Sequence, residues 1–157
     1  NVSIEMRAAV SMFGHMGIEM DPRELTDHEY NALKAAIALH KEHREFIHAA
    51  DLYRLDSDDL SINFGLIDAQ KTKALFAYNS VRETPRTGPN KLRFVGLDAD
   101  AQYTLNLVWP VKFEEYRPSS IAAVNGQTFT GEALMQFGLQ MPISFPQTSL
   151  IFELNKA

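Results

Sequence analysis

The feature that most constrains the fold is an uninterrupted helical pattern over residues 26–51, TDHEYNALKAAIALHKEHREFIHAAD. It opens with a capping box: Thr26 can accept from the amide of Glu29, and the Glu29 carboxylate can accept from the amide of Thr26. No glycine or proline interrupts the pattern, and Ala, Leu, Lys and Glu are frequent. The pattern therefore predicts one long helix.

The two faces of this helix predict two packing partners. At about 100° per residue, the polar side chains fall in one narrow strip, made of Asn31, Lys34, Lys41, Glu42 and Glu45. The apolar side chains cover an arc of roughly 200°, against ~100° for an ordinary surface helix. They are Tyr30, Ala32, Leu33, Ala36, Ile37, Leu39, Phe46 and Ile47. We expect the segments before and after the helix to cover different parts of this arc.

The segment before the helix predicts a strand followed by a loop. Apolar residues recur between Met12 and Met20, with Gly14 and Gly17 among them, and Asp21-Pro22 then begins a short turn. Strand, loop and helix would form one βα unit, which has no sheet of its own to join. Since the chain also starts at Asn1 without a methionine, we expect a piece of a larger protein. The alternative is an irregular N-terminal arm over the helix.

After residue 51 the sequence changes to short alternating segments typical of strands. The expected strands are 52–55, 62–66, 73–81, 91–97, 103–109 and 150–154. Turns are expected at 56–59 and 68–71, a loop at 84–90, and a helical turn at the start of 131–142 that ends at Gly138. Residues 110–126 give no clear assignment. This spacing favours a small antiparallel β-sandwich, so the chain is mainly β.

Composition excludes several functional classes. The net charge of −5 and the lack of a basic run argue against nucleic acid as a partner. Apolar runs are far shorter than the ~20 residues that span a bilayer, so no membrane partner is expected. With no cysteine, the chain can form neither disulfides nor thiolate metal sites, and it fits a cytoplasmic location.

Histidines are the first candidates for a metal site. His40 and His43 are three residues apart, hence neighbours on one helical face, and could form half of a site. His43 and His48 are five apart, which does not match the His-Glu-x-x-His spacing of zinc proteases. Because His40 and His43 point into the apolar arc, we interpret them as structural histidines and expect no metal and no cofactor.

The carboxylates and aromatic residues do not indicate a particular functional site either. Acidic residues in expected turns are interpreted as turn formers, namely Asp56, Asp58, Asp59, Asp98 and Asp100, while Glu114 and Glu115 suggest a solvated face. Trp109, Phe113 and Tyr116, with Tyr103, could form a sugar-stacking platform, but alternation favours a core position for Tyr103 and Trp109. No nucleophile elbow, phosphate loop or dinucleotide motif is present.

Four stretches, taken in order, resemble the C-terminal region of α-galactosidases of glycoside hydrolase family 36. They are MFGHMGIEMD at 12–21, KEHREFIHAADLYRL at 41–55, LRFVGLDADAQY at 92–103 and GEALMQFGLQMP at 131–142. The resemblance implies that residues 1–50 hold the last strand and helix of a (β/α)8 barrel. Residues 51–157 would then be the C-terminal antiparallel β-sandwich. A whole barrel needs about 250 residues and cannot fit here.

The resemblance also implies a parent enzyme that removes terminal α-linked galactose, as from melibiose or raffinose, with retention. Such a reaction uses two carboxylates, which are aspartates in this family and are expected upstream of Asn1. No catalytic, cofactor-binding or metal-binding residue is therefore assigned to this chain. We predict that it is inactive alone and packs against its own upstream barrel.

Two other functions stay open on the sequence. One is a free-standing carbohydrate-binding β-sandwich; the other is the tail of an α-N-acetylgalactosaminidase-like enzyme. The sugar specificity and any homo-oligomeric assembly of the parent are not encoded in these residues.

Overall fold

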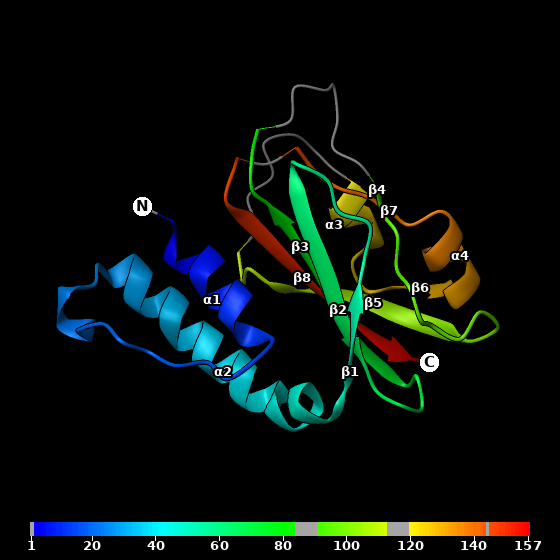
Figure 1. Cartoon of the computed structure of the whole chain (residues 1–157), viewed down its shortest axis with the longest axis horizontal. Coiled ribbons are helices and arrows are strands. Elements are labelled where there is room, and N and C mark those ends of the chain that lie inside the picture. Colours follow the sequence, from blue (N-terminus) through cyan, green and yellow to red (C-terminus); the bar gives the residue numbers. More distant parts are fainter. Residues whose placement is uncertain (1, 84–90, 113–119, 144) are drawn as a thin grey trace.

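The fold was obtained as a computed structural model, which describes residues 2–83, 91–112, 120–143 and 145–157 (Figure 1). The helical elements are α1 (Ile4–Met12), the 3-10 turn η1 (Pro22–Glu24), α2 (Asp27–Ala49), α3 (Ser120–Val124) and α4 (Gly131–Gln136). The strands are β1 (Asp51–Arg54), β2 (Ser61–Ile67), β3 (Lys73–Ser80), β4 (Lys91–Leu92), β5 (Gln102–Trp109), β6 (Gln127–Thr130), β7 (Leu139–Gln140) and β8 (Thr148–Lys156). None of the helices in these ranges has the length and apolarity needed to cross a membrane.

The long helix α2 begins as predicted. The Thr26 hydroxyl accepts from the Glu29 amide at 3.3 Å, and the Thr26 amide donates to the Glu29 carboxylate at 2.9 Å. The hydrogen bonds of this capping box hold the pKa of Glu29 below its ordinary value. A helix that starts on two reciprocal hydrogen bonds needs little help from packing at this end.

The apolar arc of α2 is covered only in part. Its fully buried residues form one stripe, Leu33, Ala36, His43 and Ile47. They face two partners, α1 on one side and the central sheet on the other. Tyr30 remains 51% exposed, and Ile37, Leu39 and Phe46 are half-buried. The two-partner prediction is confirmed, but a share of the arc is not covered by the described residues.

The strand expected between Met12 and Met20 does not form. Residues 4–12 are helical instead, with Ser3 accepting from the Met6 amide at 3.2 Å and with Ile4, Ala8, Ala9 and Met12 buried. Residues 13–20 form neither helix nor strand, and no described strand pairs with them to take up their backbone hydrogen bonds. The alternative of an irregular arm over the helix describes this segment better.

The six-stranded central sheet is antiparallel throughout, in the order β1-β2-β3-β8-β5-β6. Its β2–β3 hairpin forms where the sequence predicts a turn. There Asp68 accepts from the amides of Thr72 at 2.7 Å and Lys73 at 2.9 Å, which closes the loop. A second, two-stranded sheet pairs β4 with β7.

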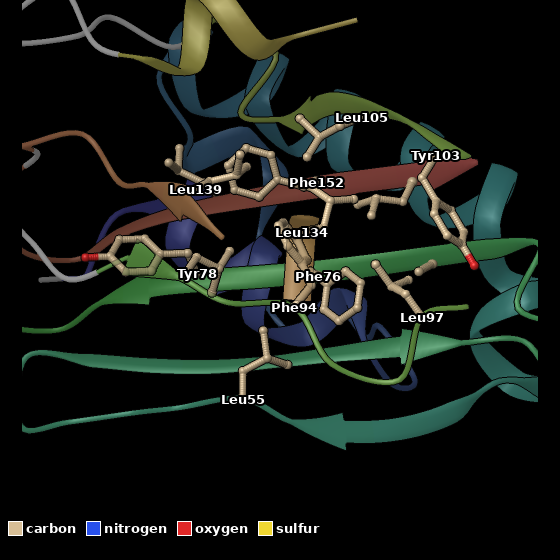
Figure 2. Close-up of a cluster of buried hydrophobic side chains, with 14 of the residues drawn as sticks. Leu55, Phe76, Tyr78, Phe94, Leu97, Tyr103, Leu105, Leu134, Leu139 and Phe152 are labelled. Carbon is tan, nitrogen blue, oxygen red and sulfur yellow. The ribbon is translucent and has the colours of Figure 1, made fainter. Parts of the chain in front are cut away.

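The main core lies between these two sheets, as a β-sandwich requires. Figure 2 shows Phe76, Phe94, Leu134 and Phe152 pointing toward one another on one face of the central sheet. The rings of Phe76 and Phe94 meet edge to face, with centroids 4.8 Å apart. The opposite face of the sheet carries α1 and α2 (Figure 1). The molecule therefore has a helical layer, a large sheet and a small sheet.

The strand expected at 91–97 is much shorter than predicted. Pairing stops after Leu92, and Gly96 adopts a φ of +78°, which a strand cannot continue through. A Cβ at Gly96 would lie 2.7 Å from the Tyr53 ring, so a side chain would not fit. The helical turn after Gly131 does form and ends before Gly138, as predicted. The expected loop at 84–90 lies outside the described residues.

Candidate functional site

A groove of about 300 Å³ lies between α1, the first half of α2 and the end of β5. Its walls are mainly apolar, with Ala32 and Ala35 facing Trp109, Pro110 and Val111. On its rim the Nε2 of His28 lies 2.7 Å from the Glu5 carboxylate. Three segments far apart in sequence thus build one surface, which no local motif could have revealed.

Trp109 anchors this groove. Its side chain is 1% exposed, and its indole N–H donates to the Glu5 carbonyl of α1 at 3.1 Å. Because indole has a single donor, this bond satisfies it completely. The tryptophan therefore attaches α1 to the sheet and cannot act as an exposed sugar-stacking ring.

The other aromatic candidates do not complete a platform either. Tyr103 is fully buried, and its hydroxyl donates to the Lys71 carbonyl at 2.7 Å and accepts from the Asp98 amide at 3.1 Å. The core position predicted for Tyr103 and Trp109 is confirmed. Phe113 and Tyr116 lie outside the described residues, as do Glu114 and Glu115.

The two candidate histidines, His40 and His43, make separate polar contacts, and the His40 ring meets that of His48 with centroids 6.4 Å apart. His43 is 2% exposed and meets Glu153 of β8, with 3.3 Å between Nε2 and Oε2. His40 lies 3.3 Å from the Met12 carbonyl through Nδ1, and the ring of His48 packs against that of His15. In the described ranges no three histidine or acidic side chains are grouped to hold a metal ion.

Glu153 is a half-buried charge that sequence reasoning missed. Its carboxylate contacts His43 and the Lys73 ammonium at 3.0 Å, and accepts from the Asn155 amide group at 2.7 Å. Burial raises the pKa of Glu153, but the hydrogen bonds from Lys73 and Asn155 and the positive charge of Lys73 outweigh it and leave the pKa below its ordinary value. These residues are brought together by sheet pairing across eighty positions, so no sequence motif marks them.

The acidic turns act as turn formers where they are described. Asp58 accepts from the amides of Leu60 at 2.9 Å and Ser61 at 2.8 Å, and Asp98 accepts from that of Asp100 at 3.2 Å. The turn containing Asp56 and Asp58 borders a pocket of about 70 Å³, far below the size of ordinary ligand sites.

The groove beside Trp109 does not have the carboxylate pair of a retaining glycosidase. Retaining hydrolysis needs two carboxylates about 5–5.5 Å apart across the scissile bond. The groove beside Trp109 is lined by one carboxylate, Glu5, which is already paired with His28.

Comparison with known proteins defines the class. Residues 63–154 match the family model described as the glycosyl hydrolase family 36 C-terminal domain, and residues 1–50 match the model described as melibiase. The chain therefore belongs to glycosyl hydrolase family 36. It corresponds to the C-terminal part of such a protein, which is what the four sequence stretches indicated.

Individual relatives agree. The chain is 29% identical to an α-galactosidase of Escherichia coli over 99% of its own length and 23% of that protein. It is 30% identical to the α-galactosidase AgaA of Geobacillus stearothermophilus over 66% of the chain and 14% of that protein. The crystal structure of AgaB from the same organism superposes with a TM-score of 0.79, at 24% identity, over 99% of this chain and 19% of that one. The chain thus spans about a fifth of the length of its relatives.

Proposed function

We propose that the whole protein containing this chain is a retaining α-galactosidase, and that this chain is its non-catalytic C-terminal part. The observation that carries the proposal is the ordered match of residues 1–50 and 63–154 to two models of one enzyme family. The relatives are named α-galactosidases, and this chain covers 14–23% of their length. Most of the enzyme, including both expected aspartates, would then lie upstream of Asn1.

We further propose that residues 1–50 end a (β/α)8 barrel and that the sandwich domain begins at residue 51. In support, α1 and α2 lie side by side and run in the same direction, while the segment between them returns the chain (Figure 1). Two parallel helices joined by an extended return have the geometry of consecutive βα units. In the whole protein, residues 13–20 would pair with barrel strands and become the strand that is missing here.

The partner of the chain would be its own catalytic barrel. The apolar side chains left accessible on and beside the helices support this, because exposed apolar surface often marks a contact with a partner. They include Val2, Val10, Ile18 and Tyr30. A cytoplasmic location is proposed on the absence of cysteine.

The test is to extend the reading frame upstream of Asn1 and assay the resulting protein on nitrophenyl α-galactoside and nitrophenyl α-N-acetylgalactosaminide. We expect turnover of the galactoside and release of α-galactose as the first product, the mark of retention. Preference for the N-acetylgalactosaminide would instead indicate an α-N-acetylgalactosaminidase-like enzyme. Absence of any upstream catalytic region would refute the proposal.

A further inference from the structure

Where α2 meets the sheet, three ionisable side chains lie together and are largely shielded from solvent. Two of them are basic and one is acidic. His43 comes from α2, Lys73 from β3 and Glu153 from β8, and all three lie on the face of the sheet that the helices cover. The side chains of His43 and Glu153 are 2% and 15% exposed, and that of Lys73 is 29% exposed. One carboxylate is thus shared between one permanent cation and one titratable ring.

The hydrogen bonding of His43 fits the neutral ring. Its Nε2 lies 3.3 Å from the Glu153 carboxylate, to which a protonated Nε2 can donate. Its Nδ1 is buried and has no hydrogen-bond partner among the described residues. In neutral imidazole such a nitrogen carries only a lone pair, whereas in imidazolium it carries a proton that must find an acceptor. The described residues around Nδ1 provide no acceptor for that proton.

Burial and the Lys73 charge also oppose protonation of His43. Burial lowers the pKa of His43 most, the Lys73 ammonium lowers it further, and the carboxylates of Glu153 and Glu42 offset this in part. Those groups come from each element that meets the ring, namely β3, β8 and α2 itself. Glu153 is already neutralised by Lys73 at 3.0 Å, so a protonated His43 would be a second cation on one carboxylate.

We propose that His43, Glu153 and Lys73 form a pH-sensitive latch, which fastens α2 to the sheet at neutral pH and releases it in acid. The latch is a property of these contacts, so it stands or falls separately from galactosidase activity. Within the proposed enzyme it would join the last barrel helix to the C-terminal sandwich. Acid would then loosen the two parts before either one unfolds.

The direction of the effect follows from linkage. An unfolded histidine binds its proton as the pH falls below about 6.5, while His43 in the folded chain resists protonation. The latch therefore stabilises the fold in full above pH 6.5, and its contribution is lost as the pH falls below that value. At pH 5.5 the unfolding equilibrium constant rises by at most about elevenfold from this residue.

The test uses urea unfolding of the chain at pH 7.5 and pH 5.5. We compare the wild type with His43→Gln, which keeps a hydrogen-bond donor but cannot titrate, and with His48→Gln, an exposed position on the same helix, as the control. The rise in the unfolding constant between the two pH values should be up to about tenfold larger in the wild type and His48→Gln than in His43→Gln. Equal rises in all three proteins would overturn the latch.

A second variant keeps the test decisive if His43→Gln fails to fold. Lys73→Met removes the competing ammonium, so a protonated His43 can pair with Glu153 alone. It should show a smaller acid-induced rise than the wild type. An unchanged rise in Lys73→Met would contradict the proposal, because a purely structural contact would leave the pH profile as it is.

Release of the helices from the sheet can be followed separately by tryptophan fluorescence. Trp109 is the one tryptophan of the sequence and is buried against α1, so its emission reports attachment of the helical layer. At pH 5.5 and low urea, wild-type emission should shift to the red before the circular dichroism of the sheet is lost. Coincident transitions at both pH values would show that no separate release occurs.

Discussion

Replacing Ile47 by alanine tests the packing of the helical layer most sharply. Ile47 is 5% exposed and lies where α2 meets Leu66, Leu75 and Ile151 of the sheet. The change deletes three carbons, worth about 0.8 kcal/mol each in transfer, or about 2.4 kcal/mol. A cavity left in the tight interface adds to this, while the higher helix propensity of alanine returns up to about 0.7 kcal/mol. We expect a net loss of about 2–4 kcal/mol.

The assay is urea unfolding of the chain, followed by circular dichroism and by Trp109 emission. Ile18→Ala is the matched control, since it deletes the same atoms from a side chain that is 43% exposed and belongs to neither helix nor strand. Its loss should stay below about 1 kcal/mol. If Ile47→Ala costs no more than Ile18→Ala, then α2 does not pack on the sheet as described.

Three further results are expected. Tyr103→Phe should lower the free energy of unfolding by about 1–3 kcal/mol, because the Lys71 carbonyl loses the hydroxyl that donates to it. A loss within about 0.3 kcal/mol would show that a water molecule replaces that hydroxyl. Gly138→Ala should lower the melting temperature, because Gly138 has a φ of +62° and a Cβ there would lie 2.3 Å from the Leu92 carbonyl oxygen. An unchanged melting temperature would mean that the turn can rearrange to accept the side chain. Separated from its proposed barrel, the chain should self-associate in sedimentation experiments, whereas a monodisperse monomer at high concentration would indicate that the helical layer needs no cover.

Local signals in the sequence predicted the parts of the fold that local interactions build. The capping box at Thr26 and the turn at Asp68 each satisfy backbone groups within five residues, so their chemistry is visible in the sequence. Alternation likewise placed Tyr103 and Trp109 in the core. The β-sandwich followed from several such strands in succession.

The rest depended on contacts that the sequence does not display. The strand expected near Ile18 needs neighbouring strands to take up its hydrogen bonds, and the described residues provide none. The burial of α1 on β8, and the meeting of His43 with Glu153, join positions more than a hundred residues apart. Their spacing is set by sheet topology, which periodicity in one segment cannot encode.

The central proposal is that this chain completes an α-galactosidase without taking part in the chemistry. The most direct measurement compares hydrolysis of nitrophenyl α-galactoside by the 157-residue chain with hydrolysis by the protein that includes the upstream region. We predict no turnover above the uncatalysed rate for the chain and clear turnover for the longer protein. Turnover by the chain alone, or none by the longer protein, would contradict the account.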